Sequence, residues 1–165
     1  MTTSHEISLT LTRAAEAEVL TGDPGCRIAL LADADGTGGA LTSNRSTFAE
    51  GADGAPPHTH EHLTELFFVL EGALEVLVAD EITVLEAGDL LVVPPGTTHA
   101  FAAAPGRTAD VLFVFAPGRE RFEYYRLLDR LHRGEGSWDE LDATQDRFDN
   151  HYSESTAWQA ARGTQ

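Results

Sequence analysis

The sequence predicts an all-β fold, an antiparallel sandwich or barrel, with α-helices after it. Between residues 26 and 117, short apolar segments alternate with turns that contain glycine or proline, and this spacing is typical of such folds. After Pro117 and Gly118 the apolar residues take up the spacing of an amphipathic helix. The 165 residues are enough for one sizeable core and few for two.

Seven or eight short strands are expected. The apolar segments place them at residues 26–32, 40–48, 64–70, 73–79, 82–85, 90–93, 99–103 and 111–116. Glu71 and Gly72 are expected to form a short hairpin between the third and fourth strands. Residues 12–20 have helical propensity, but turn residues follow at once, so an extended arm is an equal alternative.

Two helices are expected after the strands. The first carries apolar residues at positions i, i+3, i+4 and i+7, namely Tyr124, Leu127, Leu128 and Leu131. Gly134 ends it, and the capping box of Ser137 and Glu140 opens a second helix that runs to about Phe148. In the tail, Trp158 is expected to dock on the rest of the protein.

The composition excludes several kinds of partner. Asp and Glu number 27 against 11 Lys and Arg, a net charge of −16, which argues against nucleic acid and anionic membranes. The single cysteine, Cys26, allows no intrachain disulfide and is expected to be a small buried residue. No signal peptide and no apolar run of about 18 residues is visible, so we expect a cytoplasmic location.

Two stretches of the chain carry the residues of a candidate metal site. His58 and His60 are two positions apart, so on a strand both side chains leave the same face. Glu65 lies just ahead of an apolar run, and His99 is a fourth candidate from a later stretch. A buried glutamate beside histidines is costly without a cation. His62 could replace His60 as a ligand, and we favour for it an exposed place in the turn.

These four side chains suit one divalent transition metal: nickel, iron, manganese, cobalt, copper or zinc. Four protein ligands on a six-coordinate metal leave two positions for water, substrate or dioxygen, as in a catalytic site. The period of two predicts an aromatic and aliphatic wall beside the metal, because residues two apart share a face of a strand. The candidate substrate-binding residues are Phe67, Val69, Phe101, Phe113 and Phe115.

Both stretches resemble the two motifs of the cupin family. The first reads His58-x-His60, four residues, Glu65, six residues, Gly72. The second reads Gly88, five residues, Pro94-x-Gly96, two residues, His99. Two departures are the leading glycine, which is not at its usual distance, and Ala103, where the family has asparagine. The resemblance covers residues 26–117 and implies a jelly-roll barrel with His58, His60, Glu65 and His99 as metal ligands.

The C-terminal segments 122–128, 148–152 and 155–158 look like the tail of bacterial single-cupin quercetinases. That resemblance implies a metal-dependent dioxygenase that cleaves a flavonol such as quercetin with release of carbon monoxide. Glu65 would then be the catalytic general base. The implied partners are a polyphenolic small molecule and dioxygen. The alternatives are a metal cupin with non-redox chemistry, such as an isomerase or cyclase, and a cupin that binds a small ligand without catalysis.

The whole chain, 1–165, is expected to be one domain. It comprises an N-terminal arm over 1–25, a β-barrel over 26–117 and a helical extension over 118–165. We expect a homodimer, formed through sheet edges or terminal segments. His132 and His151 are interpreted as surface or helix-capping residues. The aromatic residues of the extension, expected in the core or a dimer interface or as part of a lid, are Tyr124, Tyr125, Tyr152 and Trp158.

Overall fold

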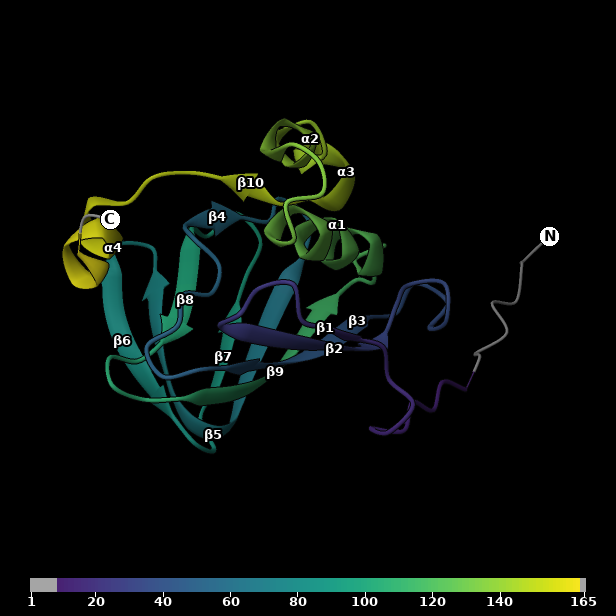
Figure 1. The fold of residues 1–165 in the computed structure, drawn as a ribbon, viewed down its shortest axis with the longest axis horizontal. Helices are drawn as coiled ribbons and strands as arrows, with labels where there is room; N and C mark the ends of the chain where they lie inside the picture. The colour runs from purple at the N-terminus through teal and green to yellow at the C-terminus, as the bar shows by residue number, and fades with distance from the viewer. Residues whose placement is uncertain (1–8, 164–165) are drawn as a thin grey trace.

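The computed structural model describes residues 9–163, in which ten strands curve into a barrel (Figure 1). Every strand pairing is antiparallel. The strands are β1 (Val19–Leu20), β2 (Cys26–Ala32), β3 (Thr42–Phe48), β4 (His58–Thr59), β5 (Thr64–Val78), β6 (Glu81–Glu86), β7 (Leu90–Val93), β8 (His99–Ala103), β9 (Ala109–Ala116) and β10 (His151–Tyr152). This architecture confirms the predicted all-β barrel with helices after it.

Strand β5 is the central strand of the sheet that forms the barrel. It runs through Glu71 and Gly72, so the prediction of a hairpin at these residues is wrong. One strand of 15 residues replaces the two predicted. Its first half pairs with β9 and β7, and its second half pairs with β6 and β8. Gly72 has φ +73°, and a Cβ there would lie 2.0 Å from the Thr108 carbonyl oxygen. The glycine therefore marks a close approach beside a β-bulge, where the strand bends and changes partners.

The remaining strands lie close to their expected places. Strands β2, β7 and β8 have the predicted bounds, whereas β3, β6 and β9 differ by one or two residues at an end. Residues 12–20 are not helical: a turn precedes the short strand β1. The two-residue strands β4 and β10 were not predicted, because only their tertiary pairing, Tyr152 with His58 and His151 with Thr59, defines them. Residues 1–8 of the N-terminal arm lie outside the described part of the chain.

Four helices follow the barrel: α1 (Phe122–His132), α2 (Trp138–Asp142), α3 (Gln145–Phe148) and α4 (Thr156–Arg162). The capping box of Ser137 and Glu140 is present, but the helix that it opens ends at Asp142 and not near Phe148. The Thr144 hydroxyl donates to the Leu141 carbonyl oxygen at 2.8 Å, a local bond that competes with the helical pattern. Within residues 9–163, no helix combines the length and apolarity needed to cross a membrane.

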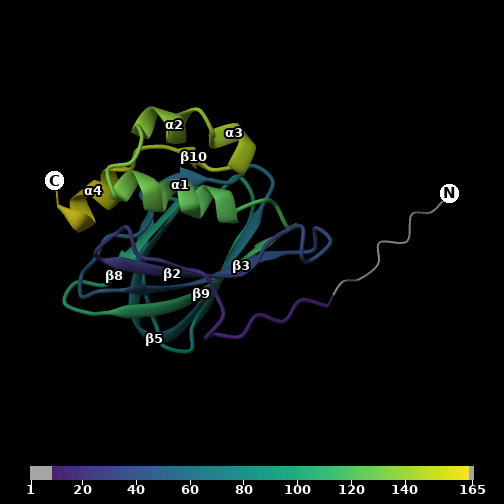
Figure 2. The ribbon, with the colours of Figure 1, turned by 45° about the vertical axis from the view of Figure 1, so that its right-hand side comes forward.

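Helices α1, α2 and α3 lie over one end of the barrel, whereas α4 lies on its flank beside β6 (Figure 1). Helix α1 lies directly on the barrel, and α2 and α3 lie further out (Figure 2). Apolar residues of α1 pack with Leu30 of β2 and with Phe148 in a second core, separate from the core inside the barrel. Trp158 of α4 docks on the barrel against Leu77 and Ala100, as expected. The two cores leave a space between α1 and the barrel.

Candidate metal centre

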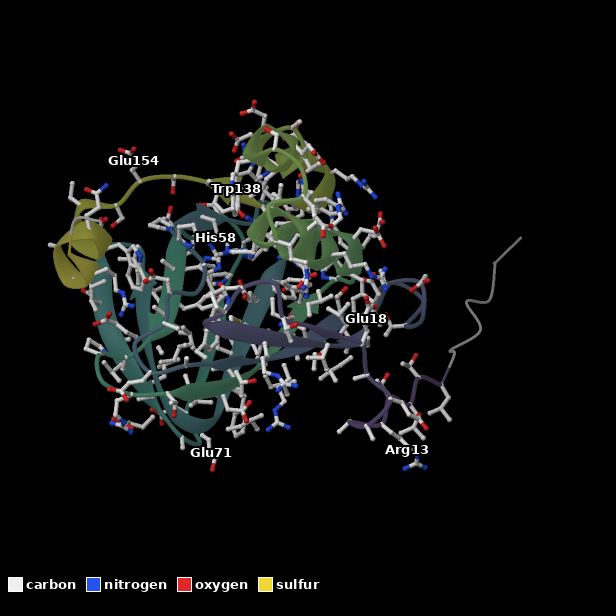
Figure 3. All side chains as sticks on the ribbon, viewed as in Figure 1. Arg13, Glu18, His58, Glu71, Trp138 and Glu154 are labelled. Atoms are coloured by element: carbon white, nitrogen blue, oxygen red, sulfur yellow. The ribbon has the colours of Figure 1, made fainter. Side chains whose placement is uncertain are left out.

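His58, His60, Glu65 and His99 meet inside the barrel. Their ligand atoms all lie within 4.8 Å of one another, and none of the four residues is more than 3% exposed. The Nε2 atoms of His60 and His99 lie 3.0 and 2.6 Å from the same carboxylate oxygen of Glu65. Figure 3 shows His58 near the barrel end that α1 covers, whereas Glu71 lies at the opposite end.

Strand pairing brings these distant residues together. His58 of β4 is the direct partner of His99 of β8, and β8 in turn pairs with β5, which carries Glu65. His60 follows β4, and its carbonyl oxygen accepts a 2.7 Å hydrogen bond from the Gly96 N–H of the second motif. The turn that contains Gly96 in the second motif thus helps to position the loop that carries His60 in the first motif.

Each histidine is oriented by a backbone carbonyl. Nδ1 of His58, His60 and His99 lies 2.8, 2.6 and 2.9 Å from a carbonyl oxygen, respectively that of Pro56, Asp149 and Thr97. A carbonyl only accepts, so each Nδ1 carries the proton, and each Nε2 is left for the centre of the group. This is the arrangement that metal-binding histidines have.

The electrostatics of the group favour a cation. Burial raises the pKa of Glu65, but hydrogen bonds with His60 and His99 outweigh it, and the pKa lies well below its usual range. Burial lowers the pKa of His58 well below its ordinary value, and the neighbouring imidazoles add to this. Burial also lowers the pKa of His99, but the hydrogen bond to Glu65 and the charge of its carboxylate together leave the pKa above its ordinary value. A divalent metal in place of the His99 proton fits three imidazole nitrogens and one carboxylate.

A cavity of about 300 Å³ opens next to the candidate metal centre. His58 and Glu65 form part of its wall. Four phenylalanines line it: Phe48, Phe101, Phe113 and Phe115. Polar side chains line it as well: Asn44, Ser46, Arg121, Tyr124, Tyr125, Asn150 and Tyr152. Of the candidate substrate-binding residues, Phe101, Phe113 and Phe115 lie on the wall. Phe67 and Val69 are core residues behind it.

Arg121, Asp149 and Asn150 are the residues of this site that sequence reasoning missed. They lie outside the two motifs and come from the helical extension, where no spacing pattern marks them. Tyr124 and Tyr125 were expected in the core, and both line the cavity as well. The sequence does not show that these two tyrosines line the same cavity as His58 and Glu65, because their place depends on how α1 packs on the barrel.

Among the described residues, three histidines and the single cysteine lie outside the candidate metal centre. The His62 side chain is 62% exposed, in agreement with its expected place in the turn. His132 lies at the end of α1, where its Nδ1 is 3.2 Å from the Leu128 carbonyl oxygen. His151 lies half-buried, with Nε2 3.6 Å from a carboxylate oxygen of Asp149. Cys26 is buried, and burial raises the pKa of its thiol to about 12, so the thiol is protonated and unreactive.

The fold and the site define a small antiparallel β-barrel with a buried group that could bind a metal ion. Residues 44–115 match the family described as "Cupin domain". The structure of KdgF from Halomonas sp. is 26% identical, with a TM-score of 0.61 over 70% of this chain and 99% of that chain. An RmlC-like cupin from Shewanella frigidimarina NCIMB 400 is 28% identical, with a TM-score of 0.59 over 70% of this chain and 96% of that chain. Over its β-barrel the chain is thus similar to cupin proteins.

One curated relative is also similar. "Oxidoreductase OpS7" of Beauveria bassiana (strain ARSEF 2860) is 43% identical over 49 residues, which are 29% of this chain. The match spans only 16% of the length of that relative.

Proposed function

We propose that this protein is a metal-dependent dioxygenase that cleaves a flavonol, such as quercetin, with release of carbon monoxide. The observation that carries the proposal is the buried group of three histidines and one glutamate, which opens onto a cavity with an aromatic wall. The short similarity to a relative named as an oxidoreductase supports the redox part of the proposal. The donor set suits nickel or iron, and equally manganese, cobalt, copper or zinc.

His58, His60, Glu65 and His99 would hold the metal, which supplies Lewis-acid and redox chemistry when bound. Glu65 is ionised at neutral pH, and its carboxylate would accept the 3-hydroxyl proton of a flavonol. Because its pKa lies below its usual range, this proton transfer requires that the hydroxyl becomes acidic in the site. Phe101, Phe113 and Phe115 would exclude water and hold the flat ring system against the site.

The test begins with anaerobic purification and loading with iron, nickel, cobalt or manganese, each verified by metal analysis. Quercetin and air are then added, and the flavonol absorbance is followed together with carbon monoxide. Loss of absorbance with formation of carbon monoxide is expected with at least one metal. An unchanged spectrum with all four metals would contradict the proposal. Glu65→Gln should keep metal with weakened affinity and lose activity, whereas the exposed His62→Ala should behave as wild type.

A metal-dependent isomerase or cyclase is a second candidate, because polar groups capable of proton transfer also surround the cavity. The Tyr152 ring centroid lies 6.4 Å from that of His58, and its hydroxyl is 2.6 Å from that of Tyr124. Such an enzyme would turn over without dioxygen. A cupin that only binds a small ligand would show a ligand-induced shift of the melting temperature and form no product.

A further inference from the structure

Arg121 is a buried charge without a carboxylate partner. It is 2% exposed and directly precedes α1. Its Nη1 donates to the Phe148 carbonyl oxygen at 3.1 Å, and its Nη2 lies 3.5 Å from the side-chain oxygen of Asn150. Within residues 9–163, Nε has no hydrogen-bond partner, and no carboxylate oxygen lies within 4.0 Å of the guanidinium. A buried cation is costly unless something compensates its charge.

Aromatic rings surround Arg121 and compensate its charge only in part. Its Cζ lies 4.3 Å from the ring centroid of Phe115, 4.7 Å from that of Tyr124 and 5.4 Å from that of Tyr125. Such contacts stabilise a guanidinium in part. Among the described residues, the side-chain nitrogen of Asn150 is a second buried donor without an acceptor. Both residues line the cavity, so an acceptor that enters it would lie beside two buried donors.

The carboxylates of the cavity wall are already paired. Glu65 belongs to the candidate metal centre. The other three lie nearer the surface. Asp53 lies 3.1 Å from Arg162 and Asp129 lies 2.9 Å from Arg133. Asp23 accepts a 2.8 Å hydrogen bond from the Gly25 N–H and lies 3.7 Å from the His132 imidazole. A divalent metal bound by Glu65 and three neutral imidazoles would have a net charge of 2 − 1 = +1, and Arg121 would add another. In the metal-free protein, Arg121 itself is the group of the cavity wall that would attract an anion, in a chain whose formal net charge is −16.

We propose that the cavity binds an aromatic anion, a ring with a carboxylate or phenolate oxygen. The ionised oxygen accepts hydrogen bonds from Arg121 and Asn150, and the ring lies against Phe101 and Phe113. An aromatic anion would be the substrate class of the proposed function. The inference rests on the proposed function in one respect only, because it takes the cavity as the substrate site. A planar guanidinium recognises carboxylate and phenolate oxygens better than a lysine ammonium does.

The test compares two probes of one shape, naphthalene-2-carboxylate and naphthalene-2-carboxamide, by calorimetry on metal-free and zinc-loaded protein. Wild type should bind the carboxylate about tenfold more tightly than the amide in the metal-free form, as expected for a hydrogen bond to a charged group. Arg121→Leu should lose this preference in the metal-free form, and Arg121→Lys should keep part of it. The matched control is Arg107→Leu, which removes an exposed arginine paired with Glu86 and should keep the full preference.

Asn150→Asp gives an independent test in case Arg121→Leu does not fold. Its new carboxylate would neutralise Arg121 internally and should abolish the preference for the anion with little change of shape. Equal binding of the two probes to wild type, absence of binding, or an unchanged preference in both variants would overturn the inference. Because no turnover is measured, a protein that prefers the anion but leaves quercetin intact would refute only the proposed function. Quercetin cleavage without the preference would refute only the role of Arg121.

Discussion

At the scale of single residues, the candidate metal centre depends on which ring nitrogen faces inward. Three backbone carbonyls take the Nδ1 protons, which leaves the three Nε2 atoms for the centre of the group with Glu65. The same stretch supplies a fourth histidine, His62, that points to solvent. Burial thus distinguishes the three candidate ligand histidines from His62.

Replacing His58 or His99 by alanine should abolish stable metal binding. Loss of a ligand should cost more than the roughly 10–100-fold in affinity that loss of an outer-shell partner costs. The measurement is metal content per chain after reconstitution and gel filtration. His62→Ala is the matched control and should retain full metal content. Normal metal content in either ligand variant would refute the assignment.

Metal binding should strengthen as the pH rises through the pKa of His99, because the metal displaces a proton from that ring. Burial lowers this pKa, but the hydrogen bond with Glu65 raises it above its ordinary value. The proton is therefore held to a higher pH than on a free histidine. Glu65→Gln removes the raising interaction, so the midpoint of the pH dependence should move to lower pH although overall affinity falls. Competition with a chromogenic chelator between about pH 5.5 and about pH 8.5 measures both midpoints. Equal midpoints would contradict this account.

At the scale of elements, β5 connects the two halves of the barrel. Residues 64–72 pair with β9 and residues 73–78 pair with β6, so Gly72 lies at the point of transfer. Its positive φ and its approach to the Thr108 carbonyl oxygen leave no space for a side chain. The path of strand β5, which carries Glu65, therefore requires glycine at position 72.

Gly72→Ala should destabilise the protein by roughly 2–4 kcal/mol, the sum of backbone strain and overpacking. Gly88→Ala is the matched control: its φ is +94°, but no atom lies within 4 Å of the added Cβ. It should lower the free energy of unfolding by only about 1–2 kcal/mol, because alanine is strained in the left-handed conformation. Urea unfolding followed by circular dichroism measures both. Equal stability of the two variants would show that the close approach is unimportant.

At the scale of the whole molecule, the helical extension reaches back to the centre of the barrel. Asp149 is the link: its carbonyl oxygen accepts from His60 Nδ1, and its carboxylate accepts from the N–H groups of Glu61 and His62 at 2.7 and 2.9 Å. Its φ of +52° is a left-handed conformation that asparagine also adopts. The helical extension thus positions the loop of His60, Glu61 and His62, and it also covers the cavity.

Asp149→Ala should therefore weaken metal affinity by about 10–100-fold while the barrel stays folded. Asp149→Asn keeps an acceptor and the backbone preference, and should recover part of the affinity. The control is Asp146→Ala, three residues earlier with a fully solvent-exposed side chain, which should bind metal as wild type does. Metal titration and circular dichroism on each variant provide the readouts. Wild-type affinity in Asp149→Ala would show that the carboxylate bonds to the N–H groups of Glu61 and His62 are not needed to position His60.

The sequence by itself predicted an antiparallel sandwich or barrel and the positions of most strands, because these follow from local spacing. The jelly-roll barrel and the set of four candidate ligands follow from the resemblance to the two cupin motifs, since spacing alone left His62 as an alternative to His60. A period of two places His58 and His60 on one side, and the turn glycines and prolines separate the strands. Only the tertiary structure decided that β5 is continuous at Gly72, and that Arg121 and Asp149 reach the site. Those features depend on contacts between residues far apart in the chain, such as Gly72 with Thr108, and no local pattern encodes them. The single-domain division, the homodimer and the cytoplasmic location stay predictions.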